Sequence, residues 1–333
     1  MIDYKREHLF ASSAKRGFTV KKTFQTLIAK QTLNRVREPR MPFDWSINPY
    51  RGCAHGCAFC YARATHKFLD KRADDSFQNH IFIKTNAAEA LESQLSQVAK
   101  RFKGNLDAVA RHFGVVAIGT ATDPYQSVEG KAKVTRECLK VLSKFRIPIT
   151  ITTRSPLILR DLDVLNGMRI ASIQISIGTL DADVCRRMEP GASRPQKRLE
   201  IVNELSQNGL PAGIFMAPIL PYLTDSAAEI ERLIAAAKGH QATFVSASVL
   251  RLIPEVKAWY FKTLKQHYPD LFPAYVKLYR NAYPHSAYVN TVMEKIDVLL
   301  KKYQLPSSLP ERYQWDKDLP SFESKGEQLA FDF

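Results

Sequence analysis

The chain has 333 residues, of which 45% are hydrophobic, and carries 48 Lys and Arg against 33 Asp and Glu. This length suits one large α/β domain with extensions, or two small domains, and the hydrophobic content is enough for a sizeable core. The charged N-terminus lacks the apolar run of a signal peptide, and no apolar segment is long enough to span a bilayer. We therefore exclude secreted and membrane-spanning classes and expect a cytoplasmic protein without a membrane partner.

The net charge of +15 favours a polyanionic partner, and nucleic acid first, through counterion release and electrostatic steering. Basic cytoplasmic proteins are also common, so charge by itself leaves the partner open.

Residues 1–43 contain many basic residues and few apolar repeats, which predicts a basic N-terminal extension. From residue 44 the pattern changes to short apolar runs that alternate with amphipathic stretches. Gly209 is expected to end one helix, and Ser226 with Glu229 forms a predicted capping box. The predicted strands are 115–119, 147–152, 169–177, 212–220 and 243–248, and the predicted helices are 87–102, 131–144, 195–207 and 226–237.

Near-continuous apolar strands alternating with helices predict an α/β fold with a parallel sheet buried on both faces. With one further strand leading into the cysteine loop described below, the chain has about six β/α units, too few for a closed eightfold barrel. We predict a partial (β/α)6 TIM-type barrel over residues 44–250. Right-handed crossovers then place all strand-end loops on one rim.

Residues 251–304 interleave aromatic and basic side chains. Tyr268, Phe272, Tyr275 and Tyr279 fall at helical spacing, which predicts a helical C-terminal segment packed on the barrel. Stacking of nucleic-acid bases on some of these rings is the alternative.

Residues 305–333 are proline-rich and poor in apolar residues, and we expect a flexible tail. Its end, Gln328–Phe333, resembles the short peptide by which bacterial proteins dock on the replicative sliding clamp, which makes that clamp a possible partner.

Three cysteines, Cys53, Cys57 and Cys60, form a C-x3-C-x2-C run beside Gly52 and Gly56. Glycine permits the tight coiling that would bring the thiols together. Thiolate sulfur is the soft donor that selects iron–sulfur clusters, zinc or Cu(I). Three ligands leave one iron of a [4Fe–4S] cube free to bind a small molecule.

Zinc and disulfides are the alternatives for this run. A zinc ion wants a fourth Cys or His, and only His55 and His66 are close in sequence. Disulfides are disfavoured by the odd count of five cysteines and the absence of a secretory segment.

The spacing, with Phe59 just before the last cysteine, resembles the signature of the radical SAM superfamily. The resemblance implies that the open iron binds S-adenosylmethionine (SAM). Reduction, by a flavodoxin or ferredoxin for example, then releases a 5′-deoxyadenosyl radical. Within the superfamily the chain is similar to the spore photoproduct lyase-like, or DNA-repair-photolyase-like, branch over residues 44–285. The stretches that carry this similarity are 48–53, 57–63, 119–126, 152–155, 188–190 and 217–221.

This resemblance implies SAM contacts on the strand-end loops. Thr122 would hold the amino acid moiety, Arg154 stands where the lyase uses a lysine near the carboxylate, and Ser176 matches a serine. Phe59, Thr120 and Asp123 complete the predicted cofactor-binding set. By residue type alone, the hydroxyls can equally be caps that tie down strand ends, and Arg154 a surface cation.

Two departures from the lyase stand out. Thr120 occupies the place of the lyase's hydrogen-donating cysteine. Of two tyrosines that flank the third cluster cysteine there, only Tyr61 remains here, and it is our catalytic candidate. This incomplete relay argues against thymine-dimer repair by the lyase route. We expect Cys138 and Cys185 to be structural, although the arginines next to Cys185 would be able to lower its pKa.

Three functional hypotheses follow. The first is a radical SAM enzyme that acts on nucleic acid, with DNA favoured, in repair or modification. The second keeps the chemistry but moves it to a protein or small-molecule substrate. The third is a zinc-binding nucleic-acid module without catalysis.

Overall fold

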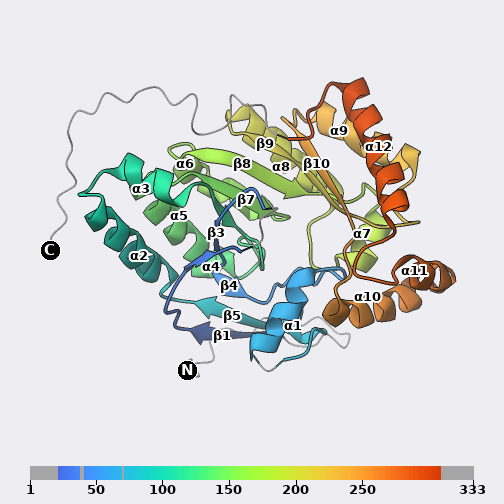
Figure 1. The fold of residues 1–333 in the computed structure, drawn as a ribbon, viewed down its shortest axis with the longest axis horizontal. Coiled ribbons are helices and arrows are strands. Elements are labelled where there is room, and N and C mark those ends of the chain that lie inside the picture. Colours follow the sequence, from blue (N-terminus) through green and yellow to red (C-terminus); the bar gives the residue numbers. More distant parts are fainter. Residues whose placement is uncertain (1–21, 38–40, 70, 309–333) are drawn as a thin grey trace.

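The computed structural model describes residues 22–37, 41–69 and 71–308. A seven-stranded sheet in the order β10-β9-β8-β7-β6-β3-β2 curves through the centre of the molecule (Figure 1). Its strands are β2 (Leu33–Arg35), β3 (Trp45–Ile47), β6 (Val116–Ile118), β7 (Ile149–Thr153), β8 (Ile170–Ser176), β9 (Ala212–Ile219) and β10 (Val245–Val249). The strands from β3 to β10 are all parallel, and β2 pairs antiparallel with β3 at the edge. The predicted partial six-stranded barrel is confirmed.

Helices connect successive strands and cover the outside of the sheet (Figure 1). They are α2 (Ala87–Arg101), α3 (Leu106–Phe113), α4 (Glu129–Ala132), α5 (Val134–Lys144), α6 (Leu162–Leu165), α7 (Ala182–Met188), α8 (Pro195–Gln207) and α9 (Ala227–Gly239). Gly209, at φ +75°, follows α8, and the N–H groups of Gly209 and Leu210 donate to Ser206 and Leu205 in a Schellman arrangement. The Ser226 hydroxyl accepts the Glu229 N–H, whereas the carboxylate of Glu229 pairs with Arg232.

A second, three-stranded sheet lies beside the barrel in the order β1-β5-β4. Its strands are β1 (Thr23–Leu27), β4 (Tyr50–Arg51) and β5 (His80–Lys84), and they lie below the main sheet in Figure 1. These strands were not predicted from the sequence, and neither were η1 (Tyr61–Leu69) and α1 (Ser76–Asn79), which precede β5. Strands β1 and β2 fall within the predicted N-terminal extension, of which residues 1–21 and 38–40 lie outside the described part.

The sequence predicted a sheet buried on both faces but not the polar character of its inner face. Outward side chains such as Ile149, Ile151 and Ile173 are fully buried against the helices. Polar side chains predominate among the alternate residues that line the cavity, namely Ser46, Thr150, Thr152, Ser172, Gln174 and Ser246, although Ala117 and Phe215 also line it. The period-2 alternation Ile-Thr-Ile-Thr of β7 records this difference.

The C-terminal helices α10 (Pro254–His267), α11 (Phe272–Leu278) and α12 (Ser286–Tyr303) pack on the barrel, at the right of Figure 1. Tyr275 and Tyr279 are fully buried, and their hydroxyls donate to the carbonyls of Pro221 and Leu250 at 2.7 and 2.8 Å. Burial removes both rings from any base-stacking role. The segment from Tyr268 to Tyr279 is not one continuous helix, because a short 3-10 helix that begins at Pro269 precedes α11.

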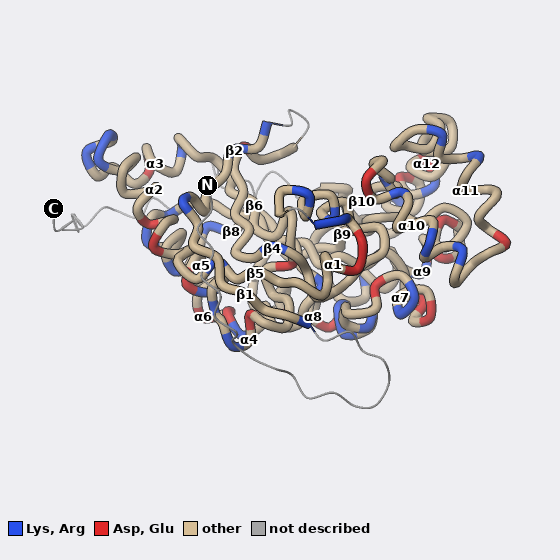
Figure 2. The backbone as a smooth tube through the Cα atoms, turned by 90° about the horizontal axis from the view of Figure 1, so that it is seen from below, with Lys and Arg blue, Asp and Glu red and all other residues tan. Residues whose placement is uncertain are grey.

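Lys and Arg alternate with Asp and Glu along the outer helices (Figure 2). Within the described ranges, no helix is both long and apolar enough to cross a membrane. The predicted clamp-binding peptide Gln328–Phe333 falls in residues 309–333, which are outside those ranges.

Candidate cluster and SAM site

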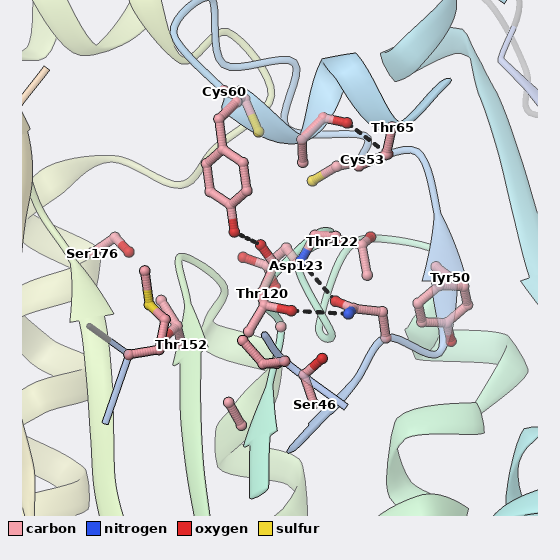
Figure 3. Close-up of a pocket in the computed structure, with 18 of the residues that line it drawn as sticks. Ser46, Tyr50, Cys53, Cys60, Thr65, Thr120, Thr122, Asp123, Thr152 and Ser176 are labelled. Carbon is pink, nitrogen blue, oxygen red and sulfur yellow. Dashed lines mark hydrogen bonds between the residues drawn. The ribbon is translucent and has the colours of Figure 1, made fainter. Parts of the chain in front are cut away.

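A cavity of about 1960 Å³ opens at the carboxyl ends of the parallel strands. All ten residues predicted for the site line it: Cys53, Cys57, Phe59, Cys60, Tyr61, Thr120, Thr122, Asp123, Arg154 and Ser176. The sulfur atoms of Cys53 and Cys60 face a shared space above Thr122, and Ser176 lies across from them on the end of β8 (Figure 3). The fold therefore brings together side chains from four separate stretches of sequence.

The cysteine loop begins at two glycines whose left-handed backbone other residues rarely adopt. Gly52 has φ +77° and Gly56 has φ +66°. A Cβ on Gly52 would lie 2.7 Å from the carbonyl oxygen of His80, so the loop passes directly over the start of β5. The Cys53 N–H donates to the Phe77 carbonyl at 3.1 Å and fixes the first thiol against α1.

Arg63 holds the loop from beneath, a role that the sequence analysis missed. Its side chain is fully buried, and its guanidinium donates to the carbonyls of Gly56 (2.8 Å), Cys57 (3.0 Å) and Asp74 (2.6 Å). A planar fork of donors suits a coiled loop whose carbonyls converge on one point. Arg63 therefore sets the curvature that brings the thiols together.

The loop that follows β6 supports the cysteine loop from the barrel side. The Thr122 hydroxyl donates to the Gly52 carbonyl at 2.7 Å. The Gln126 side chain accepts the Ala54 N–H at 2.9 Å and donates to both the Gly52 carbonyl and the Thr122 hydroxyl. Asn48, at the end of β3, binds the Thr120 hydroxyl and the Ala121 N–H. The Thr122 hydroxyl therefore positions backbone of the cysteine loop, whereas the Thr120 hydroxyl accepts a hydrogen bond from the Asn48 side chain.

Asp123 is buried among donors from three segments. Its carboxylate accepts the Thr153 hydroxyl at 2.7 Å and the N–H groups of Tyr125 and Arg154 at 2.9 and 2.8 Å, and His55 Nδ1 lies 3.2 Å away. Burial by itself would raise the pKa of Asp123, but His55 and these hydrogen bonds outweigh it and lower the pKa to about 2. This charge fastens the end of β7 to the cysteine loop.

Arg154 belongs to a buried ion-pair network. Its Nε lies 3.1 Å from Glu189 Oε2, and the guanidinium of Arg198 lies 2.8 Å from the same oxygen. Desolvation raises the pKa of Glu189, but Arg198 and Arg154 together bring it below its ordinary value. The Arg154 guanidinium also lies 5.8 Å from the ring centroid of Phe59. The predicted contact to the SAM carboxylate would therefore come from an arginine that Glu189 already orients.

The segment from Met188 to Gly191 docks on the cysteine loop. The Ala58 N–H donates to the Met188 carbonyl, and the Gly191 N–H donates to the His55 carbonyl, both at 2.8 Å. A Cβ on Gly191 would meet the Ala54 carbonyl oxygen at 2.3 Å, which only glycine avoids. We name residues 188–191 the clasp.

The electrostatics around Cys53 and Cys57 suit a cationic metal cluster. Burial raises the pKa of Cys53 to about 12 and that of Cys57 well above its ordinary value, and the charge of Cys60 adds to both shifts. Lys22, Arg63 and Arg154 supply opposing positive charge near them. Thiolates are therefore costly here unless a metal binds them, which is the behaviour expected of ligands rather than of a free nucleophile.

The zinc alternative fits less well. Within the described part of the chain, no three Cys, His, Asp or Glu side chains are grouped tightly enough for one metal ion. A single zinc ion would draw its sulfurs to about 4 Å of one another, whereas the ligands of a cube bind separate irons and stand farther apart. His66 is fully buried with its ring 5.0 Å from that of Phe77, and His55 faces Asp123. Neither histidine completes a zinc site.

The two remaining cysteines lie outside the cavity. Cys138 is buried in the core on α5. Cys185, on α7, accepts a hydrogen bond from Arg198 at 3.2 Å, and burial raises its pKa, so the adjacent arginines do not activate it. Since all five cysteines are described, no thiol outside the trio reaches the cavity.

Two buried hydroxyls on the cavity surface have no partner among the described residues. The hydroxyls of Ser176 and Ser246 are buried and make no hydrogen bond with any described residue. The Tyr61 hydroxyl donates to the Thr120 carbonyl, while the residue is 53% exposed at the cavity mouth. Buried hydroxyls without partners point to a polar ligand that would satisfy them.

Comparison with known proteins identifies the class. A profile of the Radical SAM superfamily matches residues 47–234, more than half of the chain, and the chain belongs to this superfamily. It is therefore a radical SAM enzyme, and its cofactors are a [4Fe–4S] cluster and SAM.

An uncharacterized protein of Mycobacterium tuberculosis is 31% identical over 288 residues, which are 85% of this chain and 82% of that protein. An uncharacterized protein of Methanocaldococcus jannaschii is 25% identical over 277 residues, covering 82% of this chain and 94% of the relative. Spore photoproduct lyase complexed with dinucleoside spore photoproduct shares the fold, with a TM-score of 0.60, 15% identity, and coverage of 86% of this chain and 81% of the lyase.

Proposed function

We propose that this radical SAM enzyme acts on nucleic acid, with DNA as the favoured substrate, in repair or modification. Cys53, Cys57 and Cys60 hold the cluster in this proposal, and Ser176, Arg154 and the loop after β6 hold SAM. When bound, the two cofactors supply a one-electron cleavage that yields a 5′-deoxyadenosyl radical.

The charge of the cavity surface carries the proposal. Six cationic side chains line the cavity: Lys30, Arg35, Arg51, Lys84, Arg154 and Arg251. The single carboxylate among the described lining residues is Asp123, which four protein donors already surround. A surface of this composition favours an anionic substrate through charge complementarity.

Exposed aromatic rings at the cavity mouth add to this argument. Tyr61, Phe68 and Tyr283 are 53%, 67% and 46% exposed and line the same cavity, and the Arg251 guanidinium lies 5.1 Å from the Tyr283 ring centroid. Rings interspersed with cations suit stacked bases and their phosphates. The lyase of the same fold was solved with a dinucleoside photoproduct, which supports a nucleic-acid substrate by analogy of fold.

The chain's own residues would position the reaction and exclude water from it. The buried Arg154–Glu189 pair presents a fixed guanidinium, and the unpartnered Ser176 hydroxyl has a free donor. Tyr61 directly follows Cys60 and is one of the exposed rings at the cavity mouth, and we propose it as the catalytic residue that contacts substrate.

The test is SAM cleavage by anaerobically reconstituted, reduced enzyme, followed by mass spectrometry of DNA and RNA incubated with it. A mass change in nucleic acid that requires both SAM and reductant is expected. SAM cleavage accompanied by no change in nucleic acid, and by no binding of DNA or RNA at low salt, would favour a protein or small-molecule substrate instead.

The terminal peptide Gln328–Phe333 is a further proposed contact, with a bacterial sliding clamp. Deletion of these six residues should abolish clamp binding in a pull-down, while substitution of Asp332 by Asn should leave it. Equal binding by the deleted and full-length chains would refute this contact.

A further inference from the structure

Two cationic side chains in the cavity wall have no counter-ion. Lys84, on β5, is 6% exposed, and the buried Nε of Arg51, on β4, makes no hydrogen bond. Neither side chain has a hydrogen-bond or ion-pair partner among the described residues. Because Arg51 pairs with Phe82 in the antiparallel register, Lys84, two positions further, lies on the same face of the sheet as Arg51. Both line the cavity.

This pairing is energetically unfavourable without a ligand. A buried ammonium costs several kcal/mol unless an opposite charge compensates for it, and a second cation adds repulsion. Burial and Arg51 together lower the pKa of Lys84 to about 8. The Glu129 carboxylate, which accepts a hydrogen bond from the Tyr50 hydroxyl next to Arg51, is already paired with Arg160 at 2.7 Å.

The cluster thiolates do not explain these cations. The thiols act electrostatically on Lys22, Arg63 and Arg154. For Lys84, in contrast, the charged or titratable neighbours are Arg51 on β4 and Cys138 on α5, which lies outside the cavity. The positive charge at Lys84 is therefore left for a different anion.

We infer that Arg51 and Lys84 form a phosphate-binding subsite in the wall of the substrate cavity. A guanidinium fork with an adjacent ammonium is the donor set that recognises phosphoryl oxygens. If the proposed function holds, the ligand is a backbone phosphodiester of the nucleic-acid substrate. A free phosphate or phosphate monoester has the same chemistry and is the other source.

The first experiment uses reconstituted enzyme and inorganic phosphate. Thermal unfolding is measured anaerobically in phosphate and in chloride at matched ionic strength, for the wild type, Lys84→Met and the control Lys295→Met. Lys295 is exposed on α12 and does not line the cavity. Phosphate should raise the Tm of the wild type and of K295M but not of K84M. In chloride, K84M should be at least as stable as the wild type, because an unpaired buried charge is gone.

The second experiment measures the affinity for a single-stranded oligonucleotide as a function of salt. The slope of log affinity against log salt should fall by about 1 in K84M and stay unchanged in K295M. The subsite is refuted if phosphate raises the Tm of K84M as it does that of the wild type. It is also refuted if phosphate does not raise the Tm of the wild type.

K84M can lose the phosphate-induced rise in Tm and yet keep the wild-type salt dependence of oligonucleotide binding. That result would exclude a backbone phosphodiester as the ligand and assign the subsite to free phosphate. If no oligonucleotide binds at all while the phosphate effect behaves as expected, the nucleic-acid function fails and the subsite stands. The two proposals are thus separable.

Discussion

Two walls of one cavity differ in how their polar groups are used. On the paired wall, the lining residues Thr122, Asp123 and Arg154 are engaged by protein partners, among them Gln126 and Glu189, which do not line the cavity themselves. The lining residues Arg51 and Lys84 of the small sheet and Ser176 and Ser246 of the barrel sheet, which we together call the open wall, have side-chain polar groups without a partner among the described residues. The paired groups fix the geometry of the cysteine loop, and the unpaired groups are available to bind ligands. The two walls should therefore respond differently to substitution.

The largest effect is expected at the cysteines that we propose as cluster ligands. Cys60→Ser replaces a soft donor with a hydroxyl. The reconstituted protein should therefore lose its brown colour, measured as absorbance at about 400 nm, and all SAM cleavage. The matched control is Cys138→Ala, a buried cysteine outside the cavity, which should keep both. A C60S protein that still assembles the full cluster would show that this thiol is not a ligand.

On the supporting side of the loop, Arg63→Met should cost about 3 kcal/mol of unfolding free energy, because it leaves several buried carbonyls without a donor. Chemical denaturation measures this loss. Cluster occupancy should fall in parallel, since the carbonyls of Gly56 and Cys57 lose their shared donor. Arg232→Met, on an exposed side chain of α9, should change stability by well under about 1 kcal/mol. Equal effects of the two substitutions would contradict the role of Arg63.

Lys84, on the open wall, is expected to lower the free energy of unfolding while it is charged, in contrast to Arg63, so this free energy should depend on pH. The folded-state pKa of Lys84, about 8, lies below its ordinary value of 10.5, so between these values the unfolded chain binds more protons. In phosphate-free buffer, Lys84 should therefore add about 2 kcal/mol of stability as the pH rises from about 7.5 to about 9.5. Denaturant titrations of the wild type and K84M should show this rise only in the wild type. Parallel pH profiles would place Lys84 in a solvated or compensated environment.

The smallest effect is expected at Ser176. Ser176→Ala removes one ligand hydrogen bond and should weaken SAM binding about fivefold, or about 1 kcal/mol, in anaerobic equilibrium dialysis. Ser206→Ala is the control, because this hydroxyl is also buried without a partner but does not line the cavity. Unchanged SAM affinity in S176A would remove Ser176 from the cofactor set.

The barrel and the cysteine run were predictable because both depend on local patterns. Strand and helix periodicity located the β/α units to within a few residues, as for α8, and the spacing of Cys53, Cys57 and Cys60 identified the cofactor chemistry. The alternation of isoleucine and threonine in β7 also indicates a polar inner face, but we interpreted this strand from its isoleucines alone. Strands β1 and β5 were not predicted, because a short pair of strands is stabilised by its tertiary contacts more than by the preferences of its own sequence.

The supporting contacts were not predictable in the same way. Gln126 lies more than 70 residues from Gly52, and Glu189 lies 35 residues from Arg154. Only the folded chain brings such pairs together, and a single glutamine or glutamate carries no pattern that announces its partner. The isolation of Arg51 and Lys84 is harder still to foresee, because it is defined by the absence of described partners.

The clasp has a consequence for biosynthesis. Its backbone bonds join residues 188–191 to the cysteine loop at residues 55–58, so the N-terminal third of the chain is completed by a segment that leaves the ribosome much later. A nascent chain that stops before Met188 lacks these two bonds and the carboxylate that orients Arg154. We therefore expect iron–sulfur loading to be a late, largely post-translational event, and chains truncated before the clasp to emerge without iron.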